Sequence, residues 1–158
     1  MIERLDLAPL PGEGGFFRRV WAGPEVGGRP AGSAILFFMT GSDFSALHRL
    51  DADEVWYFQG GDPVEHVQLG PAPGPPAVTV LGGNLLGGHQ PQVVARAGAW
   101  QGARLLSQAF GAGWSLLGCS MTPGWSAAGF ELADRGTLLV SFPASAPLIT
   151  ALTRTDGF

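Results

Sequence analysis

The chain has 158 residues, of which 46% are hydrophobic, 14% are charged and 25 are glycine, a composition too apolar for disorder and too turn-rich for a helix bundle. Its nine basic residues are all arginine, which excludes lysine-dependent chemistry such as a P-loop or a Schiff base. The formal net charge of −4 disfavours a nucleic-acid partner, since binding to the phosphate backbone needs clustered basic side chains. We expect one domain over residues 1–158, because a chain of this length buries roughly 70% of its unfolded surface around a single core.

The N-terminal segment predicts a helical turn and then a glycine-rich loop. Ile2–Leu7 has the pattern of a short amphipathic helix, and the stretch GEGGFFRR covers residues 12–19. In such a loop, Arg18 is a candidate for bidentate binding of a ligand carboxylate or phosphate. The alternative is a tight turn in which Glu13 pairs with Arg18 or Arg19 on the surface.

Three strands are predicted next. Ser33–Met39 is a nearly continuous apolar run, typical of a strand buried on both faces. Phe44–Leu50 and Val55–Gln59 follow, and the short polar segment Asp51–Asp53 between them predicts that they pair as a hairpin.

Alternate residues across that predicted hairpin, at even-numbered positions, include both polar and aromatic side chains. If the segment is extended, these residues face one interior: His48, Leu50, Glu54, Trp56 and Phe58. A carboxylate is costly to bury alone, so Glu54 requires a partner, and His48 is well placed to be one. A lone histidine on a strand is more often part of the core, but this pair favours a small-molecule pocket, in which Trp56 stacks on the ligand.

The middle of the chain predicts further strands separated by turns and loops, at Glu65–Leu69, Ala77–Leu81, Gln92–Arg96, Trp100–Leu106 and Trp114–Met121. Within them, Gln92 is a candidate ligand contact, whereas His66 is expected on a strand surface. Cys119 is the only cysteine, so no intramolecular disulfide forms. It is expected to be a small buried hydrophobe rather than a nucleophile. We expect a reducing, cytoplasmic location and no membrane-spanning segment.

The C-terminal segment predicts two short helices. Asp134 and Ser145 are candidate N-caps, and Pro147 suits a first helical turn. Apolar Ile149 and Leu152 are expected to pack on the outside of the β structure.

The chain resembles the cupins, and within them the Cupin_5 family. His48, Leu50, Glu54 and Gly60 follow the spacing of the first cupin motif, with leucine in place of its second histidine. Further similar blocks occur in the same order, and they are GEGGFFRRVW, SAILFF, HRLDADEVWYFQGGDPVE, PQVVARAGAWQGARLL, WSLLGCSMTPGW and ALTR. The resemblance implies an all-β cupin jelly roll, a double-stranded β-barrel with short flanking helices, and a homodimer that pairs edge strands.

The resemblance also implies a site. The second cupin motif ends in a histidine after a Pro-x-Gly step, and the matching stretch here is Arg96-Ala-Gly98-Ala-Trp-Gln101, so Gln101 stands at that position. His48, Glu54 and Gln101 are therefore the candidate metal ligands. An amide oxygen is a weak donor, so we expect no resident cofactor, and weak binding of a divalent metal is the alternative left open.

Metal-free acid–base catalysis is the second chemical hypothesis. Nucleotide-sugar epimerases of the cupin fold use a histidine base beside a carboxylate, and His48 and Glu54 are the matching pair. Those enzymes also use a tyrosine acid, whereas Tyr57, the single tyrosine, is expected to point outward. We predict an isomerase- or lyase-type enzyme acting on a sugar or organic acid, with Trp56, Gln92, Gln101 and Arg18 as ligand contacts. The alternative is a noncatalytic binding or sensor protein.

Overall fold

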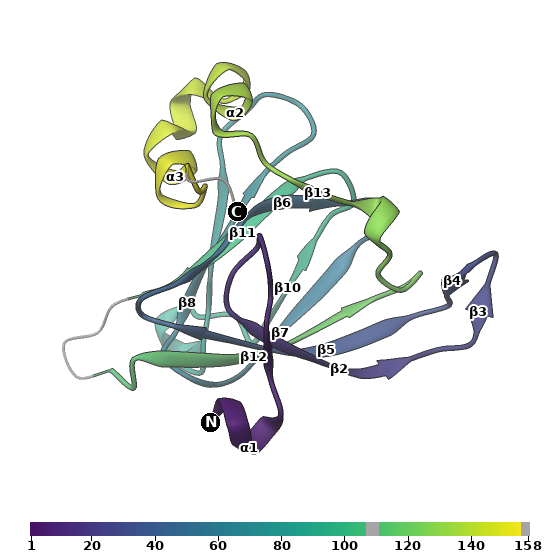
Figure 1. The fold of residues 1–158 in the computed structure, drawn as a ribbon. Coiled ribbons are helices and arrows are strands. Elements are labelled where there is room, and N and C mark those ends of the chain that lie inside the picture. Colours follow the sequence, from purple (N-terminus) through teal and green to yellow (C-terminus); the bar gives the residue numbers. More distant parts are fainter. Residues whose placement is uncertain (107–110, 156–158) are drawn as a thin grey trace.

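Two antiparallel sheets face each other in the computed structural model, which describes residues 1–106 and 111–155 (Figure 1). The first sheet has the order β1 (Ala8–Pro9), β2 (Phe16–Ala22), β5 (Ser33–Thr40), β12 (Trp114–Met121), β7 (Glu54–Gly61) and β10 (Gln92–Ala95). The second sheet has the order β13 (Phe130–Leu132), β6 (Phe44–Leu50), β11 (Trp100–Leu105), β8 (Val64–Leu69) and β9 (Ala77–Leu81). The predicted all-β jelly-roll class is confirmed.

The remaining elements are short. A small hairpin of β3 (Glu25–Val26) and β4 (Arg29–Pro30) extends between β2 and β5. The helices are α1 (Ile2–Leu5), α2 (Arg135–Ser141) and α3 (Ala146–Ala151), with single 3-10 turns at Leu85–Gly87, Ala127–Gly129 and Pro143–Ser145. No helix in the described ranges is long and apolar enough to cross a membrane.

The predicted pairing of β6 with β7 is wrong. β6 pairs with β11 and β13, whereas β7 pairs with β12 and β10, so the Asp51–Asp53 segment carries the chain from one sheet to the other. The predicted alternation of side chains still holds, because the even-numbered residues of both strands face the space between the sheets. His48 and Glu54 therefore reach the interior from different sheets.

The glycine-rich segment also differs from its predicted loop. The loop ends at Gly15, and β2 starts at Phe16 and pairs along β5. Gly14 and Gly15 have φ angles of 102° and 71°, and a Cβ on Gly15 would lie 2.9 Å from the carbonyl oxygen of Phe38. The two glycines thus permit a sharp entry into a strand, and Arg18 and Arg19 belong to that strand.

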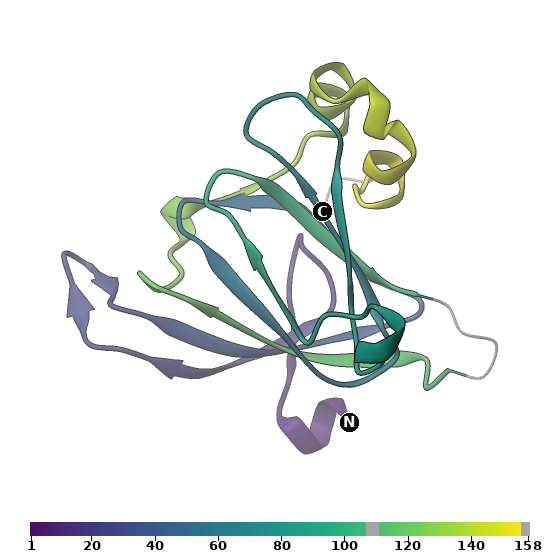
Figure 2. The ribbon, with the colours of Figure 1, turned by 180° about the vertical axis from the view of Figure 1, so that it is seen from behind.

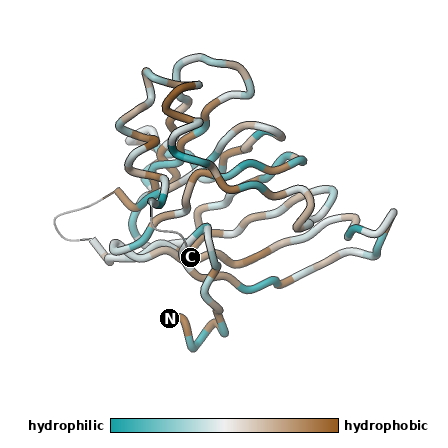
Figure 3. Tube along the Cα trace, turned by 45° about the horizontal axis from the view of Figure 1, so that its top comes forward, coloured by the Kyte–Doolittle hydropathy of each residue, from teal (hydrophilic) through white to brown (hydrophobic). Residues whose placement is uncertain are grey.

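The core has two large parts, one between the sheets and one beneath the C-terminal helices. The first part consists of Phe37, Met39, Trp56, Val64, Leu81, Ala103, Leu117 and Cys119. The second consists of Leu47, Val67, Leu69, Trp100, Leu138, Phe142, Ile149 and Leu152, and it joins the outer face of the second sheet to α2 and α3. Figure 2 shows these helices over one end of the fold, and Figure 3 shows their hydrophobic stretches. The second sheet is therefore covered on both faces.

The predicted helix signals in the C-terminal segment are largely confirmed. The Asp134 carboxylate caps α2 by accepting the Thr137 backbone N–H at 2.8 Å. Ser145 precedes α3 but makes no side-chain cap. Ile149 and Leu152 are fully buried, as expected for residues packed on the sheet.

Candidate functional site

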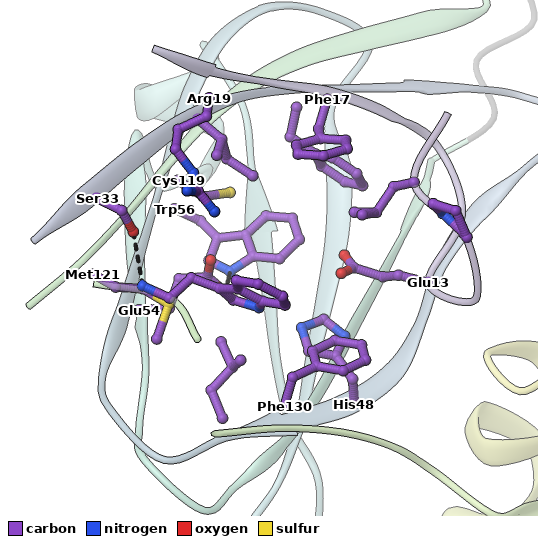
Figure 4. Close-up of a pocket in the computed structure, with 16 residues that line it drawn as sticks. Glu13, Phe17, Arg19, Ser33, His48, Glu54, Trp56, Cys119, Met121 and Phe130 are labelled. Atoms are coloured by element: carbon purple, nitrogen blue, oxygen red, sulfur yellow. Dashed lines mark hydrogen bonds between the residues drawn. The ribbon is translucent and has the colours of Figure 1, made fainter. Parts of the chain in front are cut away.

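A cavity of about 290 Å³ lies between the sheets. Strand register brings residues of four strands into rows along its floor: Arg19, Ile35, Cys119 and Trp56 form one row, and Ser33, Met121 and Glu54 form the next. The lining is completed by Leu10, Pro11, Glu13, Phe17, Phe37, His48, Leu50, Trp125 and Phe130 (Figure 4). Its walls are mainly apolar, with few ionisable groups.

His48 lies on β6 and is 2% exposed. Its Nδ1 lies 2.8 Å from the carbonyl oxygen of Ala46, and because a carbonyl only accepts, Nδ1 carries the proton. In the neutral ring, Nε2 then holds a free lone pair, and no hydrogen bond to it occurs within the described residues. The ring stacks on Phe130 at a centroid distance of 5.4 Å. His48 is thus held in one orientation with Nε2 available to a ligand.

Glu54 is the first residue of β7 and is 8% exposed. Its Oε2 accepts hydrogen bonds from Trp56 Nε1 at 3.0 Å and from Gln101 Nε2 at 2.8 Å. Burial raises the pKa of Glu54 to about 7, and the charge of Glu13 adds to this, while His48 and the two hydrogen bonds oppose it. The carboxyl therefore exchanges its proton close to neutral pH.

The sequence predicts His48 as the direct partner of Glu54. In the structure, Glu54 is instead hydrogen-bonded to Trp56 and Gln101. Trp56 Nε1 is shared between the Glu54 carboxyl and Gln101 Oε1, which it reaches at 2.9 Å. Gln101 is 2% exposed and does not line the cavity. It acts from behind Glu54 by fixing the orientation of the carboxyl.

His66 is buried, contrary to its predicted surface position. It is 1% exposed, and burial lowers its pKa to about 4, so the ring is neutral near pH 7. Its Nε2 lies 3.4 Å from Gln101 Oε1. The prediction failed because α2 and α3 bury the outer face of β8, at Val67 and Leu69, as well as its inner face. Because both faces of β8 are covered, the alternation of side chains along it does not distinguish buried from exposed residues.

Two predicted ligand contacts lie away from the cavity. Arg18 is exposed and faces away from the lining side of β2, on which Phe17 and Arg19 lie. Gln92 is exposed on β10. Because Arg18 and Arg19 lie in β2 and not in a loop, alternation brings Arg19 rather than Arg18 to the cavity. Tyr57 is 36% exposed and bonds Ser120 Oγ, so its predicted outward direction is confirmed.

Several residues line the cavity that the sequence pattern does not mark as site residues. The sequence predicts Glu13 only in a surface ion pair, yet it is 9% exposed and accepts a hydrogen bond from Ser45 Oγ at 2.8 Å. Phe130 lies on β13, a strand that was not predicted. Cys119 is buried, as expected, but it borders the cavity, and burial raises the pKa of its thiol well above the usual range. A glutamate between glycines was the available signal for Glu13.

The donor set does not fit a resident metal ion. His48 and Glu54 border the cavity, but Leu50 replaces a ligand and Gln101 Oε1 already accepts the Trp56 N–H. Over residues 1–106 and 111–155, no group of three or more His, Cys, Asp or Glu side chains is arranged to hold a metal. The polar atoms around Glu54 instead satisfy one another.

A family model and several solved structures match most of the chain. Residues 1–133 match Cupin_5, described as "Cupin superfamily (DUF985)". No curated protein matches the chain. Among solved structures, a Shewanella oneidensis protein is 30% identical with a TM-score of 0.89, over 98% of this chain and 96% of that one. A hypothetical protein from Leishmania major is 28% identical with a TM-score of 0.89, over 98% and 97% of the two chains.

A more distant structure is similar in fold alone. A cupin 2 domain-containing protein from Halorhodospira halophila has 17% identity and a TM-score of 0.59, over 94% of this chain and 88% of that one. Its likeness supports the jelly-roll architecture. With residues 1–133 matched and the cupin architecture in place, the chain belongs to the Cupin_5 family of the cupin superfamily.

Proposed function

We propose that the chain binds a small organic acid in the cavity and catalyses a proton transfer on it, in an isomerase- or lyase-type reaction. The observation that carries the proposal is the pair of ionisable groups on the cavity wall. Glu54 exchanges its proton near neutral pH because burial raises its pKa to about 7, and His48 presents a free Nε2. Titration near the working pH is what general acid–base catalysis requires.

The roles follow from the hydrogen bonds. His48 Nε2 accepts a proton from a substrate carbon beside a carbonyl or carboxyl group, because its Nδ1 proton is held by the Ala46 carbonyl. Glu54 in its protonated form then donates to a second substrate atom or to a leaving group. Arg19 at the cavity supports an acid as the substrate, since a guanidinium binds a carboxylate bidentately.

The test is exchange of substrate protons with solvent. A panel of short hydroxy, keto and amino acids is incubated in D2O with wild type, His48→Gln and Glu54→Gln, and deuterium uptake is followed by NMR. We expect wild type to exchange at least one acid, and each variant to lose about 100-fold or more in rate. The losses should not add fully in the double variant, because the two groups serve one reaction.

A noncatalytic binding protein is the second candidate. It is favoured by the replacement of two cupin ligand positions, at Leu50 and Gln101, and by the donor set that does not fit a metal. An acid that binds wild type and His48→Gln with similar affinity, but exchanges no proton with either, would support this candidate over the enzyme.

A further inference from the structure

Glu13 is 9% exposed, and one of its two carboxyl oxygens is open to the cavity. Its Oε1 accepts from Ser45 Oγ at 2.8 Å, whereas Oε2 has no hydrogen-bond partner among the described residues. The ion pairs of the described chain do not include Glu13. One neutral donor compensates a buried carboxylate only in part, so a cationic group in the cavity would be strongly favoured beside it.

The loop around Glu13 is fastened to the rest of the fold. The Glu13 carbonyl accepts the Ala46 N–H at 2.8 Å and Arg154 Nη2 at 3.2 Å. The Gly15 N–H binds the Asp43 carboxylate at 2.7 Å. The backbone that carries Glu13 is therefore held at the cavity by contacts that do not involve its carboxyl group.

Arg19 supplies the opposite charge at the same cavity. It is the single arginine among the described lining residues, and it takes part in none of the ion pairs found in the described chain. In Figure 4, Arg19 enters from β2 at the top, while Glu13 points in from the right and Glu54 lies on the left. Arg19 is exposed as a residue, whereas Glu13 is buried, and both line the cavity.

Aromatic side chains form much of the cavity wall, and they are Phe17, Phe37, Trp56, Trp125 and Phe130. Aromatic faces attract cations as well as apolar groups, so they suit a positively charged group near Glu13 and an apolar body beyond it.

We propose that the cavity takes an ammonium carboxylate, an amino-acid-like zwitterion whose ammonium group binds Glu13 and whose carboxylate binds Arg19. This assignment rests on the proposed function and names its substrate class. In this pose the carbon skeleton between the two charged groups lies in the cavity that His48 and Glu54 also line, so a proton on it is open to removal.

The experiment measures binding by calorimetry with two matched sets of compounds. One set is phenylalanine, phenyllactate and phenethylamine, and the other is ε-aminocaproate, ε-hydroxycaproate and hexylamine. In each set the apolar body is kept, while the ammonium or the carboxylate is removed. We expect wild type to bind the zwitterion of at least one set about 10- to 100-fold more tightly than either analogue, as for hydrogen bonds between charged groups.

Two variants then assign each charge. Glu13→Gln keeps an oxygen for Ser45 and should abolish the preference for the zwitterion over the hydroxy acid. Arg19→Gln should abolish the preference over the amine. Glu25→Gln and Arg18→Gln make the same chemical changes at exposed positions outside the lining and should leave both preferences unchanged.

The outcomes separate this inference from the proposed function. Equal binding of zwitterion and analogues by wild type, or unchanged preferences in Glu13→Gln and Arg19→Gln, overturns the inference even if another acid exchanges protons. A zwitterion that binds with the expected dependence on both residues but exchanges no proton in D2O supports the inference and overturns the catalytic proposal. Should Glu13→Gln fail to fold, the binding preferences of wild type and of Arg19→Gln, a change at an exposed residue, still test the inference.

Discussion

At the scale of single residues, Glu54 couples the site to the stability of the fold. Burial raises its pKa from 4.5 to about 7, so the folded chain keeps a proton that the unfolded chain has lost over this range. The free energy of unfolding should therefore fall as pH rises from about 4.5 to about 7 and stay reduced above it. By the size of the shift, the loss is about 3 kcal/mol.

Glu54→Gln should remove this loss. The free energy of unfolding of the variant minus that of wild type should be larger near pH 8 than near pH 4, as measured by urea unfolding at both values. His66, whose pKa is lowered to about 4, destabilises the fold as pH falls, but it does so in both proteins and cancels in the comparison. An equal difference at the two pH values would contradict a raised Glu54 pKa, and exposed Glu25→Gln is the control.

Gln101 adjusts the same group from outside the cavity. Its N–H donates to Glu54 Oε2 at 2.8 Å, which favours the ionised carboxyl and lowers its pKa. Gln101→Met should raise the Glu54 pKa above 7, as followed by carboxyl carbon NMR across a pH titration. Gln92→Met, an exposed change of the same kind, should leave it unaltered. A lower Glu54 pKa in Gln101→Met would show that the amide holds the protonated form instead.

At the scale of elements, the loop that carries Glu13 depends on a residue near the C-terminal end. Arg154 pairs with Asp43 at 2.7 Å and donates to the carbonyl oxygens of Glu13 and Phe44. Asp43 in turn binds the Gly15 N–H. This half-buried network links the segment after α3 to the loop before β2, so a change at Arg154 should be felt at the cavity.

Arg154→Met should lower the free energy of unfolding by about 1 to 2 kcal/mol, because Asp43 and two carbonyls lose a charged donor. Amide hydrogen exchange in residues 10–15 should become faster, and mass spectrometry of the exchanged peptides measures it. Arg96→Met removes an ion pair of the same length, 2.7 Å to Asp53, at an exposed site. That control should cost under about 1 kcal/mol and leave the loop unchanged. Unaltered exchange in Arg154→Met would separate the loop from this network.

At the scale of the whole molecule, the sequence-based expectation of a homodimer stays a prediction. β1 covers only Phe16 and Phe17, so in the described chain the outer edge of β2 has no strand partner from Arg18 to Ala22. Val20 and Trp21 on that edge are 50% and 53% exposed. An apolar edge of this kind is a template for pairing with a second strand.

Light scattering tests the dimer. Wild type should have twice the mass of one chain, and Val20→Lys should be a monomer, because a charge on the edge opposes strand pairing. Val78→Lys places the same charge on β9, at the edge of the other sheet, where Val78 is 48% exposed. It should remain a dimer. A monomeric wild type, or a dimeric Val20→Lys, would exclude the β2 edge as the interface.

Local features predicted much of this molecule. The alternation of side chains located most strands and placed His48, Glu54 and Trp56 toward one interior, and the structure brings all three to the cavity. The cap at Asp134 marked the start of α2. These features are readable because they depend on neighbours within a few residues, through side-chain period and backbone hydrogen bonding.

Tertiary structure decided what lies opposite each strand. His48 and Glu54 come from different sheets, Gln101 binds Glu54 across 47 positions of sequence, and helices from the C-terminal segment bury the outer face beside His66. Glu13 reaches the cavity from a loop that Ser45 and Arg154, both distant in sequence, hold in place. Burial and charge environment depend on such long-range packing, which the period of a single strand does not contain. The sequence by itself therefore determined the family, most of the strands and which alternate residues of β6 and β7 face the interior. Packing between the sheets decided which ionisable groups meet there.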